Sequence, residues 1–186
     1  MKFKKGKFRI DLNKENVWFV ADEHYGHTSI LKHCDRPYLT IEQMDMSLIQ
    51  NHNYVVKNDD IVFHLGDFTL LNNYEKVNEK YISKLNGKHI FLKGSHDYWL
   101  KDKNALALIE VMVNNTHLTL CHYCLRTWPR SHYNSYHLFG HSHGKLPSIG
   151  KSHDVGVDNN EYFPLSFYDI CDIMKNKEDN VNLIRK

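Results

Sequence analysis

Five short polar clusters follow one another along the chain, and each comes directly after an apolar run. They are Asp22-Glu23-His24, Gly66-Asp67, Gly94-Ser95-His96-Asp97, His122 and Gly140-His141-Ser142-His143. A short apolar run that stops at a polar or turn residue is typical of a buried strand. Because ligands gather beyond the carboxyl ends of strands in α/β sheets, we expect the five clusters to meet at one rim of the fold.

Apolar periodicity predicts alternating strands and helices in the first half of the chain. The expected strands are residues 17–21, 61–65 and 89–93, and the expected helices are residues 28–33, 41–55 and 74–85, the second of them capped by Thr40 and Gln43. In the second half, strands are expected at residues 110–114, 118–121, 136–139 and 153–157, before a helix at 166–174 that Ser166 caps. This order predicts an α/β domain whose first sheet contains parallel strands with helical crossovers.

The length of 186 residues fits one domain, and we expect a single domain over residues 1–186 with a core at about 17–174. The lysine-rich segment at residues 1–12 is interpreted as a solvated leading segment, since it lacks the apolar run of a signal peptide. No apolar stretch approaches the ~20 residues of a membrane span. The composition therefore predicts a cytoplasmic protein without a membrane partner, and no obligate protein partner is evident.

The clusters contain two carboxylates and four imidazoles, which is more than one tetrahedral zinc ion needs. These side chains are Asp22, His24, Asp67, His122, His141 and His143. A mixed nitrogen and oxygen set suits two ions of the Mn²⁺, Fe or Zn²⁺ type that share one carboxylate. Two such ions ~3.5–4 Å apart activate a water molecule and stabilise both oxygens of an in-line displacement at phosphorus. His96 would then shuttle protons, and Asp97 beside it would fix the tautomer of its ring.

The order of these motifs resembles that of the calcineurin-like metallophosphoesterases. That family carries D-x-H, G-D, G-N-H-D/E, a lone His and G-H-x-H in this order, and the match covers about residues 17–167. Residues 22–27, Arg36-Pro37, 136–139 and 154–158 are similar to a small phage and bacterial branch of the family. The resemblance implies a four-layer α/β/β/α sandwich, in which two sheets carry helices on both outer faces.

The resemblance also implies a role for each matching residue. Asp22, His24 and His143 would hold one divalent ion, and His122 and His141 would hold the other. Asp67 would bridge the two ions together with a hydroxide that attacks phosphorus in line. His96, supported by Asp97, would meet the substrate phosphate or protonate the leaving oxygen. The implied cofactors are two divalent ions, foremost Mn²⁺, with Fe, Zn²⁺ and Ni²⁺ as alternatives.

Ser95 departs from the family pattern, which places a metal-ligating asparagine at this position. A serine hydroxyl is shorter and a poor ligand, although it can hold a water molecule that fills the gap. Our hypothesis is that the second ion binds more weakly here, and that activity falls or shifts between diester and monoester substrates. An engineered substitution is equally compatible with the sequence.

Three residues outside the ligand set are candidates for substrate contact, namely His27, Arg36 and Arg126. Arg126 and Arg130 alternate with Trp128, a pattern that would suit stacking on a nucleotide or single-stranded nucleic acid. Surface charge around a packed tryptophan explains the same pattern and is favoured.

The sequence therefore predicts a phosphoric ester hydrolase, foremost a phosphodiesterase, that acts on a phosphate ester such as a nucleotide or nucleic acid. The alternatives are a phosphomonoesterase and a catalytically impaired binding scaffold with the same fold.

Overall fold

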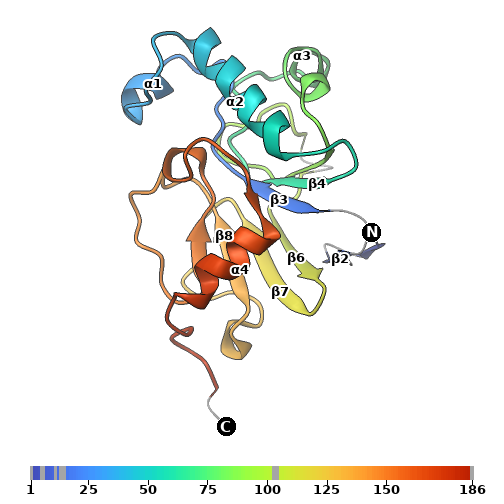
Figure 1. Ribbon diagram of the computed structural model, residues 1–186, viewed down its shortest axis with the longest axis vertical. Helices are drawn as coiled ribbons and strands as arrows, with labels where there is room; N and C mark the ends of the chain where they lie inside the picture. Colours follow the sequence, from blue (N-terminus) through green and yellow to red (C-terminus); the bar gives the residue numbers. More distant parts are fainter. Residues whose placement is uncertain (1, 5–6, 11, 13–15, 102–104, 185–186) are drawn as a thin grey trace.

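Two β-sheets and a set of helices form a mixed α/β fold in residues 2–4, 7–10, 12, 16–101 and 105–184, which the computed structural model of this chain describes (Figure 1). The strand order is β10-β3-β4-β5 in the four-stranded sheet and β1-β2-β6-β7-β8-β9 in the six-stranded sheet. The predicted α/β class with two sheets is therefore confirmed. None of the helices in these residues is long and apolar enough to cross a lipid bilayer.

The four-stranded sheet is built from the three apolar runs of the first half. β3 (Val17–Val20), β4 (Ile61–His64) and β5 (Lys88–Phe91) are parallel, and the short β10 (Leu165–Ser166) pairs antiparallel with β3. Phe19 and Phe63 point to the inner face of this sheet, where their rings stack with centroids 5.7 Å apart. The parallel strands that the sequence predicted are confirmed, so their carboxyl ends lie at one edge.

Three helices lie together against the outer face of this sheet (Figure 1). They are α1 (Ile30–His33), α2 (Ile41–Val55) and α3 (Tyr74–Lys80). The expected N-cap of α2 is confirmed, since the Thr40 hydroxyl accepts a hydrogen bond from the Gln43 amide at 3.2 Å. α3 is shorter than expected because Tyr81 leaves helical geometry (φ −129°, ψ −62°), and a 3-10 turn, Ile82–Lys84, follows.

The six-stranded sheet contains the predicted hairpin of β6 (Leu108–Val113) and β7 (Thr116–Cys121), joined at Asn114, whose φ is +51°. β8 (Tyr136–Phe139) and β9 (Ser152–Asp154) continue the sheet in parallel with β7.

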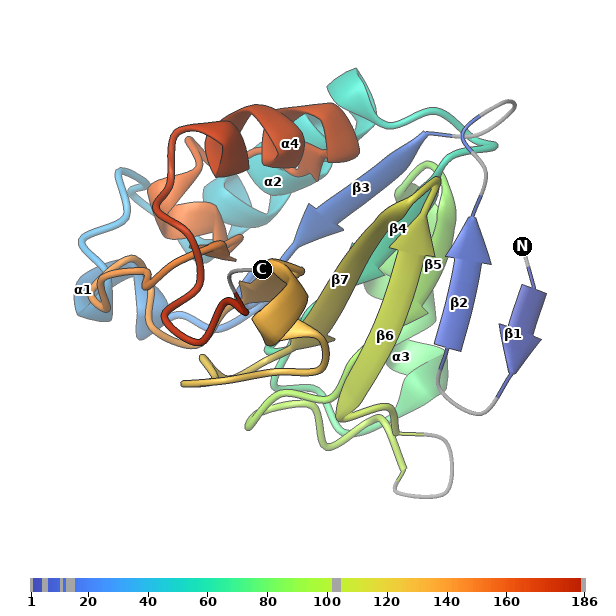
Figure 2. The ribbon, with the colours of Figure 1, turned by 90° about the horizontal axis from the view of Figure 1, so that it is seen from below.

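The interpretation of the N-terminal segment as solvated was wrong. β1 (Lys2–Lys4) and β2 (Lys7–Ile10) extend the six-stranded sheet, and β2 pairs in parallel with β6 (Figure 2). Phe8 and Ile10 are buried in the core between the sheets, so this core includes residues before the expected boundary at about residue 17. The period-two alternation of apolar and basic residues is a strand pattern that the many lysines obscure.

The core between the two sheets also receives one face of α4 (Phe167–Lys175). Its buried residues are Phe167, Ile170 and Met174, which pack with residues of both sheets. Ser166 and Asp169 form a reciprocal capping box at its start, as the sequence predicted for Ser166. This helix closes the apolar interior next to β3 and β10, and leaves the strand ends that carry the polar clusters open.

Candidate metal centre

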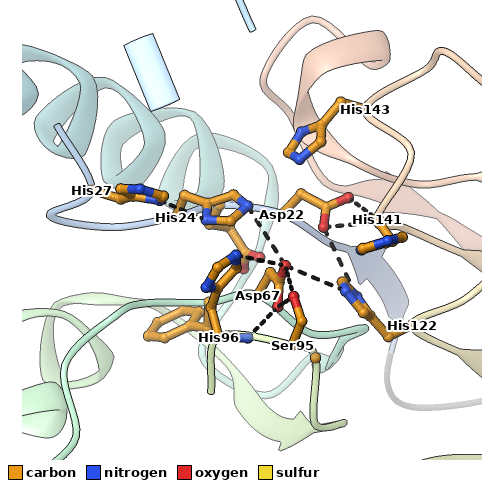
Figure 3. Close-up of polar contacts among 12 residues, drawn as sticks. Asp22, His24, His27, Asp67, Ser95, His96, His122, His141 and His143 are labelled. Atoms are coloured by element: carbon orange, nitrogen blue, oxygen red, sulfur yellow. Dashed lines mark hydrogen bonds and ion pairs between the residues drawn. The ribbon is translucent and has the colours of Figure 1, made fainter. Parts of the chain in front are cut away.

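The five polar clusters converge at the carboxyl ends of strands from both sheets (Figure 3). Asp22 and His24 follow β3, Asp67 follows β4, Ser95 and His96 follow β5, His122 follows β7, and His141 and His143 follow β8. Backbone hydrogen bonds connect these segments. The Asp22 amide donates to the carbonyl oxygen of Gly66 at 3.0 Å, and the Gly140 amide donates to the carbonyl oxygen of His122 at 3.0 Å. The predicted common rim is confirmed.

Five of these positions have left-handed backbone geometry, which is uncommon for residues other than glycine. They are Asp22 (φ 60°), His24 (φ 54°), Asp67 (φ 57°), His141 (φ 68°) and His143 (φ 47°). Such strain persists only where the surrounding structure enforces it, and it concentrates at functional sites. Here the sharp turns aim the side chains away from the strands and toward one another.

The six carboxylate and imidazole side chains that the sequence analysis singled out fall into two groups of potential ligands. Asp22, His24 and His143 form the first ligand group, and Asp67, His122 and His141 form the second ligand group. Within each group, one atom from every side chain lies within 4.8 Å of the other two. This division matches the one that the family resemblance implies. Asp67 lies beside both groups, since its Oδ2 is 3.8 Å from Nε2 of His24 and 3.3 Å from Nε2 of His122.

Two buried histidines, His24 and His122, lie at the centre of the site. Nδ1 of His122 lies 2.9 Å from the carbonyl oxygen of Leu65, which can only accept, so this nitrogen carries the proton. Nδ1 of His24 contacts Nδ1 of His27 at 3.2 Å, and the other nitrogen of His27 contacts the Ser29 hydroxyl at 2.7 Å. Nε2 of both His24 and His122 is buried without a hydrogen-bond partner. Such orphaned nitrogens next to a carboxylate fit a bound cation.

The electrostatics of the site also favour a bound cation. Burial, together with the nearby carboxylates of Asp154 and Asp67, raises the pKa of Asp22 well above its ordinary value. Burial lowers the pKa of His24 to about 3, so its ring is neutral at physiological pH, as a metal ligand must be. The Asp22 carboxylate accepts hydrogen bonds from the His141 amide at 2.8 and 3.0 Å. An amide is neutral, so these hydrogen bonds do not neutralise the negative charge. A divalent ion would supply the missing charge.

The backbone of Gly94, in the third polar cluster, packs closely against Asp67 of the second cluster. A Cβ atom at Gly94 would lie 2.3 Å from both the amide nitrogen and Oδ1 of Asp67, so no larger residue fits there without displacing this carboxylate. Ser95 is exposed next to Gly94, and its hydroxyl donates to the Asp67 carboxylate at 3.0 and 3.2 Å. Ser95 therefore lies at the second ligand group, where the sequence placed it, but it contacts the carboxylate of Asp67.

His96 lies at the open side of the site. Its amide donates to Oδ1 of Asp67 at 2.8 Å, while its side chain is 39% exposed and its Nε2 lies 4.0 Å from Oδ2 of Asp67. The ring centroid of His96 is 5.4 Å from that of His24 and 5.8 Å from that of His27. An exposed imidazole beside the ligands can meet a substrate and still exchange protons with solvent.

The predicted support of His96 by Asp97 was wrong. The Asp97 carboxylate is buried and accepts four N–H groups, from the amides of Asp67 (2.7 Å), Phe68 (2.9 Å) and Gly94 (2.8 Å) and from the indole of Trp99 (3.1 Å). Two consecutive amides of the turn after β4 point at this carboxylate, which explains why it faces inward. Asp97 thus joins the turn that carries Asp67 to the turn that carries Ser95.

The three candidates for substrate contact occupy different environments. His27 lies at the rim and orients His24. Arg36 is buried, and its three nitrogens are all hydrogen-bonded within the protein, so the prediction that it contacts substrate was wrong. Arg126 is exposed and, among the described residues, makes no hydrogen bond or ion pair with the site. Trp128 is buried, and its indole donates to Ser135, as expected for a packed tryptophan.

Two aspartates that support the site have no role in the sequence analysis, although both stand in the 154–158 motif. Asp154 is buried and accepts hydrogen bonds from the Ser142 hydroxyl (2.6 Å) and the Gly144 amide (3.0 Å), so it shapes the turn that carries His143. Asp158 accepts the Nδ1 proton of His143 at 2.6 Å, which leaves Nε2 of His143 free to bind a cation. Their sequence signal was the pair of acidic residues around Val155-Gly156-Val157.

Comparisons with known proteins give partial similarities. No protein-family model matches the chain. An uncharacterized protein of Methanocaldococcus jannaschii is 37% identical over 86 residues, or 46% of this chain and 49% of the relative, so the chain spans about half the length of the curated relative it matches.

Among solved structures, a protein of unknown function from Aquifex aeolicus is similar with a TM-score of 0.66 and 21% identity, over 86% of this chain and 100% of that chain. A predicted phosphoesterase from Streptococcus pneumoniae is similar with a TM-score of 0.43 and 17% identity, over 76% of this chain and 71% of that chain. The likeness to the Aquifex protein shows a shared fold, and the function must be argued from the site itself.

Proposed function

We propose that this chain is a metal-dependent phosphohydrolase of the calcineurin-like type, and foremost a phosphodiesterase. One observation carries the proposal: two ligand groups adjoin at Asp67, and Nε2 of both His24 and His122 is buried there without a hydrogen-bond partner. The four-layer sandwich, the dinuclear site with Mn²⁺ as the first candidate ion, and the cytoplasmic location belong to the same proposal.

The first ligand group would hold one divalent ion and the second would hold the other, with the Asp67 carboxylate between them. When bound, such ions acidify a water molecule to make a nucleophile and stabilise negative charge on the phosphoryl oxygens. The six ligand side chains fit this purpose because they are carboxylates and imidazoles, the mixture that Mn²⁺, Fe and Zn²⁺ accept.

His96 would handle the proton of the reaction. The water oxygen bonds to phosphorus as the ester P–O bond breaks, and the leaving oxygen needs a proton. An exposed imidazole within 4.0 Å of Asp67 is placed to donate that proton from Nε2 and to regain it from solvent. Asp97, by its four hydrogen bonds, would keep the turns of Asp67 and His96 in register without touching substrate.

The proposed substrate class is a phosphodiester, such as a nucleotide or a nucleic-acid end. The competing candidate, a binding scaffold with impaired catalysis, is favoured by Ser95, whose hydroxyl contacts the Asp67 carboxylate where the family pattern has a metal-ligating amide.

The test compares hydrolysis of a bis-aryl and a mono-aryl phosphate with Mn²⁺, Ni²⁺, Zn²⁺ and Mg²⁺, for the unaltered chain and for Ser95→Asn. We expect Mn²⁺-dependent turnover, faster on the diester, that EDTA removes. Faster turnover of the monoester would assign a phosphomonoesterase. No turnover by either protein with any ion would overturn the enzyme proposal in favour of the scaffold.

A further inference from the structure

We propose that Arg36 and Asp158 are positioning residues that hold the first ligand group ready before an ion arrives, so that the two ligand groups bind metal with unequal affinity. The inference rests on the proposed metal site but not on the reaction that the site performs. It assigns a purpose to a buried arginine that the metal ligands do not require.

Arg36 connects two ligand-bearing segments through one guanidinium group. Nε and Nη2 donate to Oδ1 and Oδ2 of Asp158 at 2.7 and 2.8 Å, a two-pronged ion pair of fixed geometry. Nη2 also donates to the carbonyl oxygen of Asp22 at 2.6 Å, and Nη1 donates to that of Glu23 at 2.9 Å. The same cation thus braces the left-handed turn that aims Asp22 and reaches a residue 122 positions away.

Asp158 transmits this constraint to His143. Its Oδ2 accepts the Nδ1 proton of His143 at 2.6 Å, so the ring orientation and tautomer of His143 are both set by the carboxylate. A carboxylate on the far nitrogen of a histidine ligand also makes the metal-binding nitrogen more basic. Through Asp158, Arg36 orients His143, and through the backbone it orients Asp22, which together are two of the three side chains of the first ligand group.

A contribution to stability alone is a weak explanation for the buried ion pair of Arg36 and Asp158. A buried ion pair often contributes no more to stability than apolar residues of the same volume, because both charges lose their hydration. Cys34, His143 and Asp158 also lie close enough to share an ion. However, the guanidinium of Arg36 already neutralises Asp158, and it would repel a cation there. The arrangement therefore favours a purpose directed at His143 and Asp22.

In the second ligand group, the carbonyl oxygen of Leu65 orients His122, but His141 has no comparable partner among the described residues. His141 is exposed, and among the described residues no carboxylate accepts a hydrogen bond from its ring. Ser95 adds a hydroxyl to this group in place of a ligating amide. The first ligand group should therefore bind its ion tightly and the second weakly.

The test is calorimetric titration of the metal-free protein with Mn²⁺, for the unaltered chain, Asp158→Asn and Arg36→Lys. We expect two binding steps in the unaltered chain. Asp158→Asn should weaken the tight step by about 10- to 100-fold, the usual effect of losing such a partner. The weaker step should change less than twofold. Arg36→Lys keeps the charge but loses the two-pronged geometry, so it should weaken the tight step by a smaller factor.

Asp60→Asn is the matched control. Asp60 is buried and accepts hydrogen bonds from Asn16, Trp18 and Lys57, none of which belongs to either ligand group. The Asp60→Asn variant should therefore bind Mn²⁺ as tightly as the unaltered chain. Circular dichroism in EDTA checks that each variant is folded. If Asp158→Asn does not fold, the change in the tight binding step of Arg36→Lys tests the inference.

An unchanged tight step in both variants, or equal weakening of both steps, would overturn the inference. The absence of any Mn²⁺ binding by the unaltered chain would overturn it together with the proposed function. Two-step binding without turnover on any ester would overturn the proposed function alone.

Discussion

Nε2 of His122 lies 3.3 Å from Oδ2 of Asp67, while Nδ1 of the same ring donates to the carbonyl oxygen of Leu65 at 2.9 Å. The proton on Nδ1 leaves a lone pair on Nε2, which faces the lone pairs of a carboxylate oxygen. Two acceptors in a buried place repel each other unless a cation or a proton lies near both. This contact is one reason for the metal site that we propose.

Mn²⁺ is expected to stabilise the folded chain. At a free concentration about 100 times the dissociation constant, one site adds about 2.7 kcal/mol to the free energy of unfolding. For a chain of this length, that raises Tm by about 5–10 °C in scanning calorimetry. EDTA should reverse the change.

Asp67→Asn is the matched variant for this prediction. It should lose most of the Mn²⁺-dependent rise in Tm. Its Tm in EDTA should lie below that of the unaltered chain, because the Asp67 carboxylate accepts hydrogen bonds from the His96 amide and the Ser95 hydroxyl. A rise of the same size in this variant would show that Mn²⁺ binds elsewhere.

Ser95→Asn is expected to strengthen metal binding at the second ligand group by about tenfold or more, because an amide oxygen replaces a weakly ligating hydroxyl. Turnover of a phosphate diester should rise with it. Ser95→Ala serves as the control: it removes the hydrogen bond to Asp67 without adding a ligand, so it should not raise the affinity. Titration with Mn²⁺ measures both, and equal affinities for Ser95→Asn and the unaltered chain would contradict the hypothesis.

Substitution of Asp97 should mainly lower stability, whereas substitution of His96 should mainly lower turnover. Asp97→Asn places an amide NH₂ against two N–H donors, so it should lower the free energy of unfolding by about 3 kcal/mol in urea denaturation. His96→Gln changes a half-exposed ring and should cost less than about 0.5 kcal/mol, but it should reduce turnover by about 10²- to 10⁴-fold. A stable and inactive Asp97→Asn variant would restore the direct role that the sequence predicted for this residue.

His137 should make the fold sensitive to acid. Its ring is buried, accepts the Leu125 amide at Nε2 (3.0 Å) and contacts the Thr119 carbonyl through Nδ1 (3.0 Å), and burial lowers its pKa to about 4. The unfolded chain, with a histidine pKa near 6.5, binds more protons than the folded chain between about pH 6.5 and pH 4. Stability is therefore lost as the pH falls through this window, by up to about 3 kcal/mol.

The measurement is the free energy of unfolding in urea at several pH values from 7.5 to 4.5. His137→Gln should have a shallower dependence on pH than the unaltered chain, by up to about 1.4 kcal/mol per pH unit. His33→Gln, at an exposed position, is the control and should leave the slope unchanged. Equal slopes for His137→Gln and the unaltered chain would show that folding does not lower the pKa of this ring.

Local patterns in the sequence predicted much of the fold. The apolar runs before Asp22, Asp67 and Gly140 became β3, β4 and β8, because short apolar runs between turns have few other ways to be buried. Strand β2 escaped notice, since its partner β6 lies some 100 residues away and the lysines of residues 1–12 suggest a solvated segment. Helix α3 ends early because Tyr81 packs against Tyr25, a tertiary contact that the periodicity of residues 74–85 does not contain.

The sequence by itself determined which residues can bind metal and in what order they follow the strands, since carboxylates and imidazoles are recognisable wherever they stand. Only the tertiary structure decided what supports them. Asp97 turns inward to four N–H groups, Arg36 is enclosed by the carboxylate of Asp158 and two carbonyl oxygens, and Asp158 orients His143. These roles depend on hydrogen bonds between segments distant in the chain, and the direction of a buried side chain is set by the donors and acceptors that surround it, which the residue type alone does not specify.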